Sequence, residues 1–403
     1  MTDVRLSGPR AADHQEIRRA RIAVSAVFFL LGAEMAVWAV MVPLIRLKFG
    51  WDEAELSRLL LAFGAGAILA VPTASYILKR RRHGQVTRMF GYMSLPLIGF
   101  VGIVSNVPAL FVLVFAQGCL LAVTDIAMNA NAVELEDEAG RPIVSSFHAW
   151  FSLGGFLGVL FGPMAAFFGL AQMGALSAAG LVLAFTILQT HLLNRPVKTV
   201  EAAPSRGAGW WRNIKWIILV LALANLTAYA LEGTVVDWSG VYIEKVLGAE
   251  PAQYGLGFAV FSVAMAVMRF SGDALRARFG ARRLLAFSCI VSAIAYAWVA
   301  SVPTVWAALP AYALLGVGLA NLVPILFVAA ARVPGVTAGS GIALVAGLGY
   351  VGFLTFPPVV GFLATFYGLD TVFLGLAVIA ALTTFIAVAM PGRPTEKVSE
   401  QGP

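Results

Sequence analysis

The sequence has 403 residues, of which 60% are hydrophobic and only 12% are charged, and its mean hydropathy is +0.86. These values exclude an ordinary soluble domain and indicate that lipid surrounds most of the chain. The net charge of +7 does not indicate a nucleic-acid partner, because the Lys and Arg residues occupy the connections between apolar segments rather than forming one basic groove.

Apolar segments of about 20 residues, long enough to cross a bilayer core about 30 Å thick, recur along the chain. The pattern predicts helices over residues 20–44, 54–77, 86–104, 107–134, 143–166, 169–192, 214–241, 254–275, 281–301, 304–329, 338–363 and 367–390. A polar segment with Asp3, Asp13 and Glu16 precedes the first, which is not the pattern of a cleaved signal peptide. We therefore predict an all-α membrane protein with twelve transmembrane helices.

Basic residues are divided unequally between the two sets of connections. One set, with both ends of the chain, holds the arginines from Arg5 to Arg21, Lys79, Arg80, Arg81, Arg82, Arg88, Arg141, Arg195, Lys198, Arg206, Arg212, Lys215, Arg276, Arg278, Arg282, Arg283, Arg332, Arg393 and Lys397. The other set holds Arg46, Lys48, Arg58 and Lys245. Because basic loops stay on the cytoplasmic side, we predict a multi-pass protein of the bacterial inner membrane with both termini in the cytoplasm.

The chain divides into two similar halves. Residues 194–213 are polar and predict a cytoplasmic linker between six-helix halves at 21–193 and 214–390, with cytoplasmic tails at 1–20 and 391–403. An internal repeat keeps nearly one register for four pairs: Glu34 with Glu232, Gly50 with Gly248, Gly84 with Gly280, and Asp125 with Asn321. Two parallel repeats of this kind enclose a central substrate cavity near the middle of the membrane.

Two carboxyl groups within these helices are the first functional candidates, since an ionisable residue at a helix centre costs about 2.5–3.5 kcal/mol unless it has a partner or a cavity. Glu34 shares a helix face with Trp38, and Asp125 shares one with Asn129 and Gln117. A carboxyl group in a cavity can bind and release a proton as its hydration changes. We predict that Asp125 and Glu34 couple proton movement to transport; the alternative is structural hydrogen bonding between helices.

Other polar residues are predicted to contact the substrate. His148 and Ser152 lie on one face of the fifth helix, and Glu232 and Asn321 are repeat partners of the two carboxyl positions. Packing is the alternative for His148, and amide bonding between helices is the alternative for the asparagines. The predicted substrate-binding set is Glu34, Trp38, Gln117, Asn129, Asn131, His148, Ser152, Glu232 and Asn321.

A third group is predicted to act in gating. Arg269 and Asp273 are four residues apart in the eighth helix and are expected to form a salt bridge on one face. Arg278 and Gly280 follow in the next loop, and Asp237 lies near the outer end of the seventh helix. The equivalent loop of the first half lacks acidic residues, so a latch there must use carboxylates from elsewhere. The candidates are Glu134, Glu136, Asp137 and Glu138.

The sequence has no P-loop, HExxH, CxxC or GxSxG motif and no clustered His and Cys ligands. The two cysteines, Cys119 and Cys289, lie in apolar segments and are predicted to pack there. We therefore expect no enzyme activity, no cofactor and no metal site, and active transport would draw on an ion gradient.

Three segments resemble a known family. GDALRARFGARR, from Gly272 to Arg283, resembles the loop motif of the major facilitator superfamily, although Ala277 stands where an Asp usually precedes the Arg. DIAMNANAVELEDEAGRPIVSSFHAWFSLGGFLG, from Asp125, and EGTVVDWSGVY, from Glu232, resemble the MosC/YbjJ-like subgroup, which is related to the fucose permease family of sugar:proton symporters. The resemblance implies a proton symporter in which Glu34 and Asp125 match two functional carboxylates, with Glu first and Asp second here.

The leading hypothesis is proton-coupled symport of a small polar solute, a sugar, polyol or amino-polyol, by alternating access. One alternative is a proton-coupled antiporter that exports a metabolite or drug. An alternative of another class is a non-transporting membrane sensor or assembly protein. The expected partners are the solute, protons and the lipid bilayer, and we expect a monomer.

Overall fold

The computed structural model describes residues 14–51, 53–158, 169–189, 216–250, 253 and 256–389, and these residues form helices and short connections. The helices are α1 (His14–Phe49), α2 (Glu53–Leu78), α3 (His83–Ile103), α4 (Val107–Ala139), α5 (Val144–Gly158), α7 (Leu170–Gln189), α8 (Trp216–Lys245), α9 (Leu256–Phe279), α10 (Ala281–Ser301), α11 (Val305–Leu319), α12 (Leu322–Ala331), α13 (Ala338–Tyr367) and α14 (Leu369–Ala389). Ten described segments are long and apolar enough to cross a membrane.

The predicted helices correspond to described ones, with two differences. The tenth, predicted over 304–329, is interrupted at Ala320 and Asn321, so that α11 and α12 are separate helices. The first begins at His14, inside the predicted tail. The predicted linker at 194–213 and the end of the fifth predicted helix lie outside the described residues.

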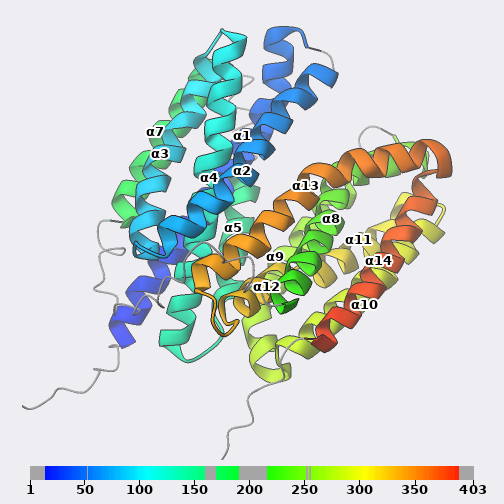
Figure 1. The fold of residues 1–403 in the computed structure, drawn as a ribbon. Coiled ribbons are helices and arrows are strands. Elements are labelled where there is room, and N and C mark those ends of the chain that lie inside the picture. The colour runs from blue at the N-terminus through cyan, green and yellow to red at the C-terminus, as the bar shows by residue number, and fades with distance from the viewer. Residues whose placement is uncertain are drawn as a thin grey trace, which may run out of the picture.

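The helices form two bundles, which Figure 1 shows as a blue-to-green group and a green-to-red group. In the first bundle α1 packs on α5, α2 on α4 and α3 on α7; in the second, α8 packs on α13, α9 on α11 and α10 on α14. The second set of pairs repeats the first in order along the chain. The internal repeat seen in the sequence is therefore also a repeat of packing.

The same repeat is visible in the backbone where the first helix of each bundle ends. Gly50 follows α1 with φ of 64°, and Gly248 follows the end of α8 with φ of 62°. Only glycine adopts this left-handed conformation without a steric cost, so the chain can turn sharply after α1 and after α8. The predicted pairing of Gly50 with Gly248 agrees with this geometry.

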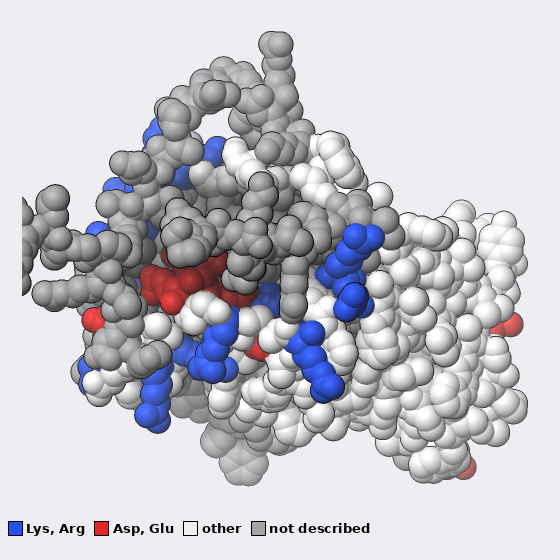
Figure 2. Space-filling model, turned by 90° about the horizontal axis from the view of Figure 1, so that it is seen from below, with Lys and Arg blue, Asp and Glu red and all other residues white. Residues whose placement is uncertain are grey.

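The bundles meet mainly through α2 against α13 and α5 against α9. We name the end of the molecule with the α2–α3, α4–α5, α9–α10 and α12–α13 loops the basic end; Figure 2 shows Lys and Arg gathered there, beside a cluster of Asp and Glu. Ser75 of α2 donates a hydrogen bond to Ser340 of α13 near this end, at 3.1 Å. At the opposite end Lys48 bonds within its own bundle, to the carbonyl of Val104 at 2.6 Å.

Candidate functional site

Asp125 joins the two bundles at mid-helix. Its Oδ2 accepts a hydrogen bond of 2.7 Å from the hydroxyl of Tyr350 on α13, and its Oδ1 accepts one of 3.2 Å from Asn129, one turn along α4. The Asp125 side chain is half-buried, as is Tyr350. A carboxyl group in this position can change both its charge and its bond to the other bundle when it takes up a proton.

His148 extends this network to α5. Its Nε2 lies 3.0 Å from the Asn129 Oδ1, and its ring packs edge-on against Phe28, with centroids 5.2 Å apart. On the other side it meets Phe327 of the second bundle at 6.2 Å. His148 is therefore buried between apolar rings and reaches Asp125 only through the Asn129 amide.

Arg269 of α9 is the cation of the site. Its guanidinium donates a hydrogen bond of 2.6 Å to the Ser152 hydroxyl of α5 and one of 3.1 Å to the Ala320 carbonyl. It also forms a salt bridge with Glu232 of α8 at 3.4 Å. The Ala320 carbonyl lies where α11 stops, so the guanidinium satisfies a backbone group that the broken helix leaves free. Ser152 and Glu232 thus come together with a cation between the bundles.

The prediction of a salt bridge between Arg269 and Asp273 is wrong. Asp273 instead accepts hydrogen bonds from the backbone N–H groups of Ser145 and Ser146 at the start of α5, at 2.8 and 2.7 Å. The helix spacing allowed the predicted pair, but packing against α5 gave each residue a nearer partner.

Aromatic residues of the second bundle form a wall beside Asp125. Tyr229 lies edge-on to Tyr350 and to Phe353, with ring centroids 6.4 Å apart in both cases. These three residues were not predicted as site residues, because aromatic residues are common in membrane helices. The only signal was that Tyr229 precedes Glu232 by three positions on one helix face.

Glu34 lies elsewhere, inside the first bundle. Its Oε1 accepts hydrogen bonds of 2.5 Å from both Ser94 of α3 and Gln117 of α4, and the residue is 1% exposed. Gln117 is eight residues from Asp125, which corresponds to about 12 Å along an α-helix. Trp38 is likewise buried and stacks on Phe63 at 5.3 Å. The structure thus separates Glu34, Trp38 and Gln117 from the network at the bundle interface.

Two other predicted substrate residues differ in surroundings. Asn131 is half-buried on α4. Asn321 is fully buried at the break between α11 and α12, next to Gly272, and within the described part of the chain neither its Oδ1 nor its Nδ2 has a hydrogen-bond partner.

Glu136 at the end of α4 organises the basic end. It pairs with Arg276 and with Arg332, the latter at 2.9 Å, both from the second bundle. It also accepts hydrogen bonds from the backbone N–H groups of Ile143 and Val144, at 2.9 and 3.1 Å. Glu136 is one of the predicted latch carboxylates, but its partners Arg276 and Arg332 were not predicted.

The remaining gating candidates make other contacts. His83, the first residue of α3, lies 2.9 Å from Glu134, one of the carboxylates predicted to form a latch with the first-half loop. Arg278 is exposed and lies over the Phe279 ring at 5.3 Å, Gly280 has φ of 82° before α10, and Asp237 is exposed near the far end of α8. These three do not join the bundle interface network.

Comparison with known sequences gives related membrane proteins. A family model described as Major Facilitator Superfamily matches residues 220–403. An uncharacterized MFS-type transporter of Yersinia pestis is 31% identical over 363 residues, covering 88% of this chain and 91% of that protein. The membrane protein MosC of Rhizobium meliloti is 29% identical over 381 residues, covering 91% of this chain and 89% of that protein.

Solved structures share the fold. FucP in its outward conformation matches with a TM-score of 0.78 and 17% identity, over 92% of this chain and 98% of that one. The proton:xylose symporter XylE matches with a TM-score of 0.75 and 13% identity, over 93% and 96%. The human organic anion transporter MFSD10 matches with a TM-score of 0.70 and 14% identity, over 92% of this chain and 99% of that one. At these identities the likeness extends to fold alone.

Proposed function

The chain belongs to the major facilitator superfamily, and from this premise we propose that it is a proton-coupled symporter of a small polar solute. It is a multi-pass membrane transporter of the secondary type, not an enzyme. The proposed solute is a sugar, polyol or amino-polyol, and the proposed location is the bacterial inner membrane with both termini in the cytoplasm.

The bond between Asp125 and Tyr350 is the observation that carries the proposal. It connects an ionisable group of α4 to α13 of the other bundle at 2.7 Å. Protonation of Asp125 removes the negative charge that accepts this bond, and so changes how strongly the bundles are held together. A proton that acts on the contact between bundles can act on the equilibrium between their arrangements.

The chemistry around Asp125 supports a polyhydroxylated solute. Tyr229, Tyr350 and Phe353 offer aromatic faces, while Asp125 and Glu232 offer acceptors and Arg269 a donor. Sugars have apolar C–H faces and many hydroxyls, and a site of this composition suits both. Two of the fold neighbours are by name a fucose:proton symporter and a proton:xylose symporter, which agree with this class, whereas a third is an organic anion transporter.

The contacts between bundles support a state that is closed at the basic end. Asp273 with the start of α5, Glu136 with Arg276 and Arg332, and Ser75 with Ser340 all lie there. With the basic end in the cytoplasm, solute and proton would enter from the outside, and breaking these contacts would release them inside.

Solute-dependent proton movement in proteoliposomes tests the proposal. Sugars, polyols, amino-polyols and common drugs are added to wild type, to Asp125→Asn and to the control Asp370→Asn, whose carboxylate is exposed at the start of α14. We expect proton influx with one solute class, lost in Asp125→Asn and kept in Asp370→Asn. Proton efflux against entering solute would instead support the antiporter, and full activity in Asp125→Asn would exclude Asp125 as the coupling group.

The pH dependence of solute affinity gives an independent test. In a symporter, proton and solute favour the same state, so the solute Kd should fall as pH is lowered through the titration of the coupling group. In an antiporter they compete, and Kd should rise. Calorimetry at several pH values on wild type and Asp125→Asn measures this; saturable binding without flux would favour the non-transporting alternative.

A further inference from the structure

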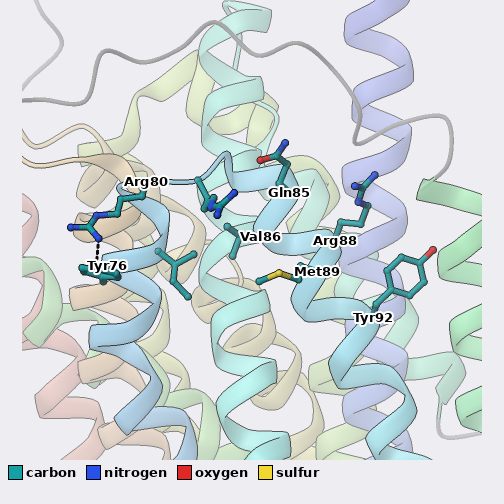
Figure 3. Close-up of a pocket in the computed structure, with 9 residues that line it drawn as sticks. Tyr76, Arg80, Gln85, Val86, Arg88, Met89 and Tyr92 are labelled. Carbon is teal, nitrogen blue, oxygen red and sulfur yellow. Dashed lines mark hydrogen bonds between the residues drawn. The ribbon is translucent and has the colours of Figure 1, made fainter.

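A groove lies on the outside of the first bundle, where α2 ends and α3 begins, away from the site between the bundles (Figure 3). Its volume is about 840 Å³. Arginines and apolar side chains line it, together with Gln85 and two tyrosines. Because the loop between α2 and α3 is at the basic end, the groove lies at the level where a membrane helix meets the head groups.

Three arginines form the rim: Arg80, Arg81 and Arg88. Arg80 is exposed, lies over the Tyr76 ring at 3.9 Å and donates a hydrogen bond to its hydroxyl, which holds the guanidinium at the groove. Arg81 is exposed as well. Among the described residues, no carboxylate forms an ion pair with Arg80 or Arg81, so their charge is available to an anion from outside the chain.

The floor is apolar and continues toward the middle of the membrane. Ile77 and Val86 lie at its base, and Met89 of α3 is 51% exposed. One turn further along α3, Met93 is 49% exposed on the same face. A hydrocarbon chain that begins under the arginines therefore finds apolar side chains below it on α3.

We propose that this groove binds one anionic phospholipid of the surrounding leaflet. The phosphate group would lie against Arg80 and Arg81, and the upper part of one acyl chain would follow Met89 toward Met93. Arginine binds phosphate oxygens through its planar guanidinium. Tyr76 of α2, which contacts Arg80 four residues further along the chain, is of the residue type that is enriched where membrane helices meet the head groups. A soluble anion would use the rim but leave the apolar floor in contact with bulk lipid.

The second bundle provides an internal comparison. At the corresponding end of α9, Arg276 pairs with Glu136 and lies near Asp273. The loop of the first bundle has a denser basic run and no acidic residue. In this proposal the lipid phosphate balances the charge of Arg80 and Arg81. Arg282 and Arg283 are exposed in the first turn of α10 but do not line the groove, so they are a matched control of equal charge.

The test is lipid binding to the purified, delipidated full-length chain, followed by native mass spectrometry. Phosphatidylglycerol is titrated against phosphatidylcholine with the same acyl chains. We expect phosphatidylglycerol to bind more tightly and the variant Arg80→Gln/Arg81→Gln to weaken it about 30-fold, from about 1 kcal/mol for each arginine near an anionic lipid. Arg282→Gln/Arg283→Gln should change the affinity for phosphatidylglycerol by less than about threefold.

Two further arms separate a lipid from other ligands. Met89→Asp should weaken phosphatidylglycerol binding although every arginine remains, because the acyl chain loses its apolar contact. Glycerol 3-phosphate, which has the head-group chemistry without chains, should not compete. Equal binding of the two lipids, equal losses in the two arginine pairs, or full competition by glycerol 3-phosphate would each overturn the proposal. None of these measurements depends on transport activity.

Discussion

The carboxyl groups of Glu34 and Asp125 differ in what a proton on each would change. Both partners of Glu34 belong to its own bundle, so its protonation acts on packing among α1, α3 and α4. One partner of Asp125 belongs to the other bundle, so its protonation acts on the contact between bundles. Of the two, Asp125 is therefore the better candidate for coupling in this state, and Glu34 is positioned to stabilise the first bundle.

We expect Glu34→Ala to lower the free energy of unfolding by about 1–3 kcal/mol, because Ser94 and Gln117 both lose their acceptor in a water-free interior. Glu34→Gln keeps an oxygen acceptor of the same shape and should cost less than about 1 kcal/mol. Thermal unfolding in detergent measures both. Glu250→Ala, at an exposed position, is the control; a Glu34→Ala protein as stable as wild type would mean that the two hydrogen bonds contribute nothing.

At the scale of elements, glycines allow helices of one bundle to approach closely. A side chain at Gly32 of α1 would collide with the Phe151 carbonyl of α5, and one at Gly154 of α5 would collide with the Phe29 carbonyl of α1. The α2–α4 pair repeats this with Gly66 and Gly118. In lipid, helices associate through such close packing because water no longer drives apolar surfaces together.

Gly154→Ala should therefore force α1 and α5 apart and lower stability by about 1–3 kcal/mol, the usual cost of overpacking. Gly180→Ala is the matched control, since a Cβ there meets nothing within 4 Å. It should be neutral or slightly stabilising, as alanine favours helix more than glycine does. Unfolding temperatures of the two variants give the comparison, and equal effects would show that helix propensity, not contact, governs both positions.

For the whole molecule, one carboxylate holds much of the basic end together. Glu136 is 3% exposed and faces two arginines of the other bundle, Arg276 and Arg332. Arg276 is also buried, so the loss of its partner would leave a charge away from water. Any motion that separates the bundles here must break this cluster.

Glu136→Gln should shift the equilibrium toward an open basic end by at least about tenfold. Spin labels at Arg141→Cys and Arg278→Cys, in a chain with Cys119 and Cys289 replaced by serine, report the distance between the bundles. Asp137→Asn is the control, because its pair with Arg332 is exposed and contributes little. If the two variants give the same distance distribution as wild type, Glu136 does not hold the state closed.

The orientation in the membrane makes a separate prediction. A green fluorescent protein fused after residue 403 should fluoresce, because it folds in the cytoplasm, and alkaline phosphatase fused after residue 250 should be active on the outside. The reverse result would invert the assignment of the basic end and the direction of transport proposed from it.

The spans, their order, the repeat and the family could all be predicted from the sequence. Each depends on a local property, such as apolar length, the charge of a loop, or a motif of neighbouring residues. The break at Ala320 and Asn321 escaped this reasoning because the segment stays apolar throughout. At this break Arg269, on another helix, donates a hydrogen bond to the Ala320 carbonyl.

The tertiary structure alone decided which polar residues meet. Glu34 bonds Ser94 across 60 positions of sequence, Arg269 takes Glu232 rather than Asp273, and Arg332 reaches Glu136 across 196 positions. Spacing along one helix fixes which side chains share a face, but not which face turns toward which neighbour. That rotation follows from how all the helices of both bundles pack together, where a buried polar group takes the partner that packing brings within reach.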